Sequence, residues 1–230
     1  MPLLNVCSVQ VRSDRLAVYE DGVRRIARRA AERRSDTRWH AQQVAFGSIG
    51  LIHFVSEHAD WASLGKQGSP QDLILGLLGN RSGAKVNRDL IECVVDMNYT
   101  VSRDRPDLSY EPAPASQITP LSLVTVLRAR PGGVEACEEL IRNVAEAIPK
   151  ADDPSRLHAY QTVIGDLRTY WTVRPIQRMD ELDQMLPPQD LLIRAFGPVD
   201  GARRFRTGID SLQHAERQMT VLRPELSHWS

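Results

Sequence analysis

The sequence repeats itself at a constant offset of 118 residues. The segment RPDLSY at 105–110 matches RPELSH at 223–228, and PQDLILGLLG at 70–79 matches PQDLLIRAFG at 188–197. The shift pairs 112 residues (230 − 118), and 27 of these pairs are identical, whereas roughly 6% identity is expected for unrelated chains of average composition. The chain is therefore predicted to be a tandem duplication of one unit.

The predicted copies span residues 1–112 and 119–230, and a linker at 111–120 joins them. The linker sequence, EPAPASQITP, is rich in proline and small polar residues, which is typical of a connection between folded parts. Each copy has enough residues to bury a hydrophobic core of its own. We therefore predict two domains of similar fold.

The composition argues against several classes of protein. Lys plus Arg and Asp plus Glu number 29 each, so there is no global positive charge of the kind that favours nucleic acid or an anionic membrane. The first residues, MPLLNVCSVQV, do not resemble a signal peptide, and no apolar run approaches the roughly 18 residues of a transmembrane helix. Three widely spaced cysteines indicate neither a disulfide framework nor a metal cluster. We expect a cytoplasmic protein without a nucleic-acid or membrane partner.

Both copies show the same predicted order of elements. β-Branched residues predict a first strand, apolar residues at helical spacing predict a helix, and a tight turn at a glycine predicts a hairpin of two strands. A second helical region follows, with Ser69 as its N-cap and Gly79 at its end, and then a last strand that the RP(D/E)LS segment closes. The elements are expected at 5–12, 16–30, 39–46, 49–56, 69–79, around 84–97 and at 99–103 in copy one, and at 123–130, 134–148, 157–164, 167–174, 188–197, around 202–216 and at 217–223 in copy two.

The resulting order, βαββαβ, is the ferredoxin-like arrangement of a four-stranded antiparallel sheet with helices on one face. The other face of such a sheet is bare and needs a partner. We therefore predict an α+β fold in which two tandem ferredoxin-like units pack sheet to sheet as a pseudo-twofold α+β barrel. Arg105 and Arg223, at the same place in the two closing segments, are expected to tie the strand ends to their neighbours.

This architecture resembles the dimeric α+β barrel superfamily in a single-chain form. The resemblance covers nearly the whole chain and rests on element order, unit length and duplication. Members of the superfamily include cofactor-independent monooxygenases of aromatic polyketides, haem proteins such as chlorite dismutases and dye-decolourising peroxidases, muconolactone-type isomerases and amino-acid-binding modules. The resemblance implies a small-molecule ligand, held between sheet and helices or within the barrel, and it does not select one activity.

Two pairs of polar residues are shared by the copies on the second strand. His40 matches His158, and Gln43 matches Gln161. Because side chains alternate along a strand, the histidines and the glutamines point to opposite faces. One pair could line a cavity between the sheets as ligand-binding residues, or both could serve the duplicated scaffold.

Other candidates lie where the copies differ. By the 118-residue shift, His53 of copy one corresponds to Trp171 of copy two, and Tyr160 adds a hydroxyl to copy two. A cofactor-independent oxygenase needs a base and polar donors around an acidic phenol or enol. His53 or His158 could be that base, with the candidate ligand-binding residues His40, Gln43, Arg128, Tyr160, Gln161 and Trp171 orienting the substrate. Amphipathic strands whose aromatic side chains only pack in the core, without a functional role, would give the same pattern.

We predict no cofactor and no metal site, with haem as the alternative that the superfamily offers. The helix at 24–34, RRIARRAAERR, is basic, and its counterpart at 135–148 is acidic. The charged faces of these helices could simply be exposed to solvent. Alternatively, the basic helix of one chain could bind the acidic helix of another, which would give a salt-sensitive homo-oligomer. The function expected is small-molecule binding, with metal-free oxygenase or isomerase activity, and the alternative is a non-catalytic ligand-binding or oligomerisation scaffold. An enclosed cavity with a titratable group distinguishes the enzyme from the scaffold.

Overall fold

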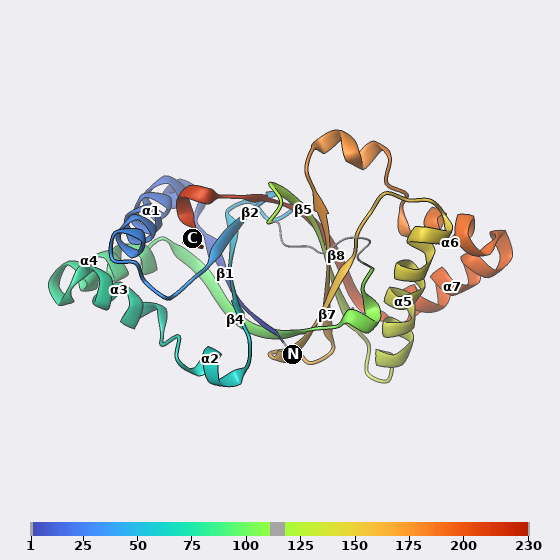
Figure 1. Cartoon of the computed structure of the whole chain (residues 1–230), viewed down its shortest axis with the longest axis horizontal. Helices are drawn as coiled ribbons and strands as arrows, with labels where there is room; N and C mark the ends of the chain where they lie inside the picture. Colours follow the sequence, from blue (N-terminus) through green and yellow to red (C-terminus); the bar gives the residue numbers. More distant parts are fainter. Residues whose placement is uncertain (1, 111–117, 230) are drawn as a thin grey trace. The chain divides into compact units, whose positions relative to one another are not determined.

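The structure, a computed structural model, describes residues 2–110 and 118–229 (Figure 1). Most of the predicted linker, from 111 to 117, therefore lies outside the described residues. The elements in chain order are β1 (Leu3–Val11), α1 (Leu16–Glu32), β2 (His40–Phe46), β3 (Leu51–His58), α2 (Trp61–Gly65), α3 (Pro70–Leu78), α4 (Asn80–Ile91), β4 (Val94–Asp104), β5 (Leu121–Ala129), α5 (Val134–Lys150), β6 (His158–Ile164), β7 (Thr169–Ile176), α6 (Pro188–Phe196), α7 (Pro198–Asp210) and β8 (Leu212–Leu222).

The strand order is the ferredoxin-like one in both halves, β4-β1-β3-β2 and β8-β5-β7-β6. The central pairs have equivalent registers, since Val6 lies opposite Val55 and Val124 lies opposite Val173. The complete strand order is closed, so the described chain is a mixed α+β fold with an eight-stranded barrel and seven α-helices. The common origin of the halves, their sheet-to-sheet packing and the homo-oligomer stay predictions.

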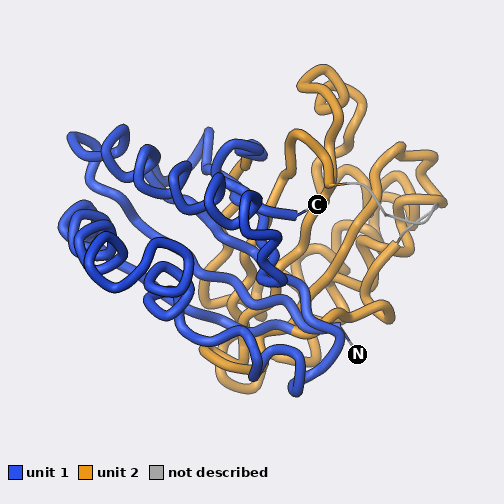
Figure 2. Tube along the Cα trace, turned by 60° about the vertical axis from the view of Figure 1, so that its left-hand side comes forward, with its two compact units in different colours: residues 1–102, 221–230 blue, residues 103–220 orange. Residues whose placement is uncertain are grey.

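Two compact units are present, and each draws on both halves of the sequence. Unit 1 comprises residues 1–102 and 221–230, and unit 2 comprises residues 103–220 (Figure 2). Helices α1, α3 and α4 group together in unit 1, and α5, α6 and α7 group together in unit 2 (Figure 1). Each unit therefore contains the closing segment of the other copy. The repeat boundaries proposed above concern the sequence and stay a prediction.

Arg105 fixes the closing segment of unit 2. Its backbone N–H donates to the Ala159 carbonyl on β6 at 2.9 Å. Its guanidinium donates to both carboxylate oxygens of Glu138 on α5, at 2.6 and 3.0 Å, and to the Gln161 amide oxygen at 2.9 Å. This cation holds the pKa of Glu138 below its usual range. A charge-assisted, bidentate contact of this kind attaches the strand end to the helix and to the sheet together.

Arg223 makes the corresponding contacts in unit 1. Each of its partners lies 118 residues before the equivalent partner of Arg105 in the sequence. Its N–H donates to the Ala41 carbonyl at 2.9 Å, and its guanidinium donates to both carboxylate oxygens of Glu20 at 2.8 and 2.9 Å. The Gln43 amide oxygen accepts a further hydrogen bond from it. The two arginines thus tie the strand ends to their neighbours as expected, and their contacts give a structural reason for glutamine at both 43 and 161.

The helix expected around 84–97 ends earlier, and the last strand is correspondingly longer. Helix α4 stops at Ile91 and β4 begins at Val94, where the strand had been expected at 99. Val86, Leu90, Val94 and Met97 keep an apolar spacing of three or four residues across this boundary, so the helical period runs on into the strand. The same correction applies to 202–216, because α7 ends at Asp210 and β8 begins at Leu212.

Helix α3 begins and ends as its sequence predicts. The Ser69 hydroxyl accepts a hydrogen bond from the Asp72 N–H at 3.1 Å, and the Asp72 carboxylate accepts one from the Ser69 N–H at 3.2 Å. Pro70 occupies the first turn, and Gly79 ends the helix at φ = 78°. This capping box satisfies donors that the first turn would otherwise leave without a partner.

The face of the unit 1 sheet that points away from the helices carries a buried Ser–His pair. Ser8 on β1 lies opposite His53 on β3, and the Ser8 hydroxyl is 2.8 Å from His53 Nδ1. His53 is only 6% exposed, and its burial lowers its pKa to about 4. The imidazole is therefore neutral at neutral pH.

Replacing Arg105 with alanine should lower the free energy of unfolding by about 2 kcal/mol, because Glu138 is left partly buried without its cation. Urea denaturation at pH 7 measures the loss. The control is Arg178→Ala, which breaks an exposed pair with Asp180 and should cost less than about 0.5 kcal/mol. Equal, small losses in the two variants would contradict the assignment.

The buried histidine predicts acid sensitivity of the fold. The unfolded chain binds a proton near a pKa of about 6.5 and folded His53 only near about 4, so stability falls as the pH drops through this window. At pH 5 the loss relative to pH 7 is about 2 kcal/mol from this group. We expect His53→Gln to remove that part of the pH dependence in urea denaturation, and His214→Gln, at an exposed position, to leave it unchanged. Identical pH dependence in wild type and His53→Gln would rule this out.

Candidate functional site

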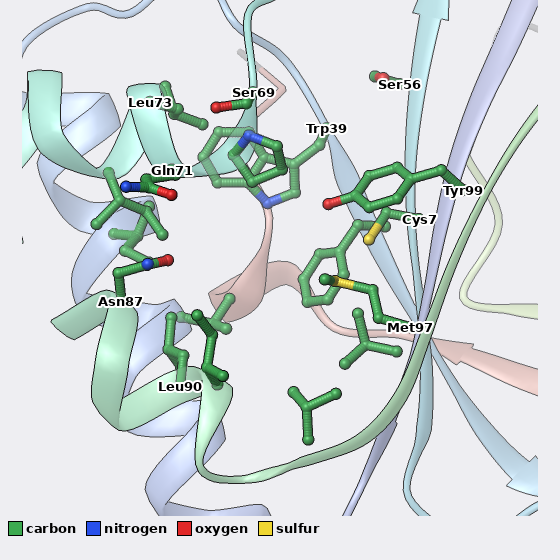
Figure 3. A pocket seen from close by; sticks show the side chains of 18 of the residues that line it. Cys7, Trp39, Ser56, Ser69, Gln71, Leu73, Asn87, Leu90, Met97 and Tyr99 are labelled. Carbon is green, nitrogen blue, oxygen red and sulfur yellow. The ribbon is translucent and has the colours of Figure 1, made fainter. Parts of the chain in front are cut away.

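Unit 1 contains a cavity of about 810 Å³ between its sheet and its helices (Figure 3). The wall is mostly apolar and includes Val9, Tyr19, Val23, Phe54 and Ile74. The volume lies within the range of about 300–1,000 Å³ that is typical of small-molecule sites. Every residue that lines the cavity belongs to unit 1.

Regular alternation in the sequence brings these side chains together. Asn5, Cys7 and Val9 are every second residue of β1 and all line the cavity. On α1, Tyr19, Val23 and Ile26 recur at spacings of four and three residues, so they share one helix face. The cavity is therefore enclosed by one face of the sheet and the apolar stripe of the helix.

A chain of hydrogen-bonded polar groups lies at one end of the cavity. The Asn5 amide donates to the Gln67 amide oxygen at 3.1 Å, and the Gln67 amide nitrogen donates to the Ser56 hydroxyl at 3.2 Å. Ser56 Oγ lies 3.2 Å from Nε2 of His58, at the end of β3. With Gln67 as the donor, the Ser56 hydroxyl has its own proton available for His58. Asn5, Ser56 and Gln67 line the cavity, and His58 contacts it only through Ser56.

A thiol and a phenol form a second polar group on the sheet side. Cys7 and Tyr99 are hydrogen-bonded to each other, and burial raises the pKa of both side chains. Both are therefore neutral at neutral pH, and the thiol is a weak nucleophile there. Figure 3 shows the two side chains projecting from the sheet, beside Met97, into the space that Asn87 and Gln71 reach from the helices.

Strand β4 forms an exposed part of the cavity lining, and its residues up to Met97 fall in the stretch that the sequence led us to assign to a helix. Val95, Met97 and Tyr99 line the cavity and are 66%, 49% and 39% exposed. Ile91, at the end of α4, is also exposed there. Apolar side chains at the mouth and apolar walls inside favour a hydrophobic ligand.

None of the site residues expected in unit 1 lines this cavity. Gln43 binds Arg223, as described above, and His53 pairs with Ser8 on the opposite face of the sheet. His40 alternates with Ala41, whose side chain lies in the helix-side core, and burial lowers the pKa of His40 to about 4. Their roles at a site stay predictions.

The residues expected in unit 2 are spread over several contacts. Arg128 forms an ion pair with Asp166, and Gln161 accepts from Arg105 while donating to the Tyr170 hydroxyl at 3.1 Å. The Trp171 indole N–H donates to the Thr162 hydroxyl at 3.3 Å. His158 and Tyr160 lie on the same strand, β6, two residues apart. In the register of β6 and β7, Tyr160 lies directly opposite Trp171, so the sheet brings these two candidates together. Gln161 is joined instead to the Arg105 network. The roles of these residues at a site stay predictions.

Differences between the copies, which we used to choose His53, Tyr160 and Trp171, also mark the cavity residues. At several lining positions a polar residue of copy one is replaced by a residue of another class in copy two, including Asn5 by Leu123, Ser56 by Arg174, Gln67 by Met185, Ser69 by Pro187 and Asn87 by Phe205. A residue that packs for the fold alone is expected to keep its class in both copies. The differences therefore indicate the polar end of a cavity that the copies do not share.

Haem, which the superfamily resemblance offers, does not fit this cavity. None of its lining residues in the described chain is His, Lys or Arg, so there is no imidazole ligand and no cation for the propionates. Cys7 and Tyr99 could ligate iron only as anions, and burial opposes their ionisation. Across the described residues, no group of three or more His, Cys, Asp or Glu side chains is arranged to hold a metal ion. A helix able to cross a membrane is likewise not found in that part of the chain.

Comparison with known proteins gives a fold but no family. No protein-family model and no curated protein matches the sequence. An anthrone oxidase-like protein superposes with a TM-score of 0.61 at 12% identity, covering 96% of this chain and 91% of that one. A Lactobacillus acidophilus protein provisionally named a monooxygenase gives 0.56 at 5% identity, covering 99% and 96%. A chlorite dismutase variant from Candidatus Nitrospira defluvii gives 0.55 at 10% identity, covering 97% and 92%. At these low identities the likeness shows that the chain shares the overall fold of these solved structures.

Proposed function

We propose that this protein binds a small, largely apolar aromatic molecule in the cavity of unit 1 and oxygenates it without a bound cofactor. The observation that carries the proposal is the cavity itself, with mostly apolar walls and the hydrogen-bonded groups Asn5, Gln67 and Ser56 in its lining. The fold likeness to proteins named as a monooxygenase and as anthrone oxidase-like supports the same choice. A metal-free isomerase acting on an enol would use the same groups.

An anthrone represents the proposed class of substrate. Loss of a proton from its central CH₂ group gives a delocalised anion that can react with O₂. One anthrone and one O₂ then yield one anthraquinone and one water. One oxygen atom becomes the new carbonyl, and the other leaves as water with the two hydrogens of the CH₂ group.

The polar chain at the end of the cavity supplies the groups that this reaction needs. His58 accepts the Ser56 hydroxyl proton across their 3.2 Å contact while Ser56 takes the proton of the substrate. The Gln67 amide, which donates to Ser56, holds that hydroxyl in place. The hydroxyl of Tyr99 and the amide of Asn87 face the ligand from two other sides and fix its orientation.

We further propose that duplication of one ferredoxin-like unit gave the two halves and that they then diverged. Unit 1 acquired the polar end of the cavity, while Arg174 and Phe205 stand in unit 2 where unit 1 has Ser56 and Asn87. The alternative function is a non-catalytic scaffold that only holds a ligand or joins chains. Ligand binding without turnover would favour that alternative.

Filling the cavity should abolish ligand binding without unfolding the chain. Asn87→Phe introduces the side chain that the equivalent position of unit 2 carries, so the helix has a precedent for it. We expect anthrone to quench the fluorescence of Trp39, which lines the cavity, in the wild type and to lose affinity by about tenfold or more in the variant. Lys85→Phe, on the exposed side of the same helix, is the control and should bind as the wild type does. Unchanged binding by Asn87→Phe would place the ligand elsewhere.

Catalysis is tested by oxygen consumption with anthrone. His58→Gln keeps a hydrogen-bonding group beside Ser56 but accepts no proton, so turnover should fall by about a hundredfold while anthrone affinity stays within about twofold. His214→Gln should leave both unchanged. Equal turnover by His58→Gln and the wild type would exclude the proposed base, and no anthrone-dependent oxygen uptake by the wild type would exclude this oxygenase reaction.

A further inference from the structure

Arg174, on β7 of unit 2, is a buried cation whose guanidinium is incompletely paired. It alternates with Tyr170 and Thr172, so it lies on the sheet face that bears the helices, where Tyr170 packs in the core. The residue is 7% exposed, and its Nη2 is buried without a hydrogen-bond partner among the described residues. An ionised group held in this way is unfavourable unless something neutralises it.

A second cation lies near the first. Arg217, on β8, donates from Nε to the Thr125 hydroxyl at 3.2 Å, and its side chain is accessible to solvent. Burial lowers the pKa of both arginines, and the charge of Arg217 lowers the pKa of Arg174 further. The two guanidinium groups are therefore close enough for their charges to repel each other.

The nearby carboxylate compensates for only one of these charges. Asp153 attracts Arg174, which raises the pKa of the arginine. Both Asp153 oxygens already accept hydrogen bonds, from Ser155 through Oδ1 and from the Leu186 N–H through Oδ2 at 2.8 Å. Two arginines and one aspartate leave a net charge of +1 at this place.

These groups occupy the positions that form the ligand cavity of unit 1. Arg174 corresponds to Ser56, Arg217 to Tyr99 and Thr125 to Cys7 by the 118-residue shift. In unit 2 these positions lie on β5, β7 and β8, and in unit 1 they lie on β1, β3 and β4. The equivalent place in unit 2 has thus become cationic, whereas that of unit 1 is uncharged at neutral pH on these three side chains.

We propose that unit 2 binds the carboxylate group of a small organic acid between Arg174 and Arg217. A carboxylate carries the single negative charge that the site lacks, and its two oxygens match the donor pairs of guanidinium groups. The Thr125 hydroxyl, held by Arg217, provides a further donor. Arg217 is the solvent-accessible member of the pair. This site is separate from the aromatic site of unit 1 and does not depend on its assignment.

Titration calorimetry and thermal unfolding of the full chain with sodium benzoate, sodium acetate and inorganic phosphate, at constant ionic strength against sodium chloride, test this proposal. We expect the two carboxylates to bind and to raise the melting temperature, and Arg174→Met to weaken benzoate binding by about tenfold or more. Arg178→Met, at an exposed arginine, is the matched control and should bind as the wild type does.

Arg217→Met keeps the test decisive if Arg174→Met fails to fold, because Arg217 is accessible and its loss leaves the core intact. Weaker benzoate binding by this variant supports the site. Binding of phosphate but of neither carboxylate would overturn the ligand class. Equal benzoate affinity in the wild type and in the soluble arginine variants would overturn the site, as would the absence of any carboxylate effect beyond that of chloride.

Discussion

The bidentate contact between an arginine of a closing segment and a glutamate of the first helix organises both units. Arg105 joins Glu138, and Arg223 joins Glu20, so in each case the end of a last strand is attached to a helix from the other half of the sequence. The ion pair is one of few in the described chain that is largely protected from solvent. Because the guanidinium also binds a glutamine of the sheet, helix, strand end and sheet are fixed by one side chain.

The two units share these contacts but differ in the residues that lie between their sheet and their helices. In unit 1, small and polar residues on the sheet leave a cavity bounded by Trp39 and Phe54. In unit 2, Tyr170 and two consecutive leucines, Leu191 and Leu192, are fully buried, and arginines replace the polar end. The two units thus have the same network at their strand ends, while the residues under their helices differ.

The sequence alone supplied the element order, the α+β class and the caps of α3, since these follow from local periodicity and from residues such as Ser69 and Gly79. The prediction was wrong at the boundary between Ile91 and Val94, because the helical spacing of apolar residues continues from the helix into the strand. The candidate site could not be predicted, because identity between copies drew attention to Gln43 and Gln161. Their shared identity follows from their contact with the arginines. The cavity depends on which side chains of distant strands and helices meet, and on volumes that no local pattern contains.

The exchange of strand ends has a consequence for the autonomy of the halves. If the chain were separated at the linker, the first piece would lack 221–230, and the second would lack 103–110, so each would expose the side of its first helix that the arginine now covers. Neither piece contains all of a unit. Two such pieces could complete both units only by associating with each other. The covalent linkage therefore keeps within one molecule two segments that would otherwise have to bind each other from solution.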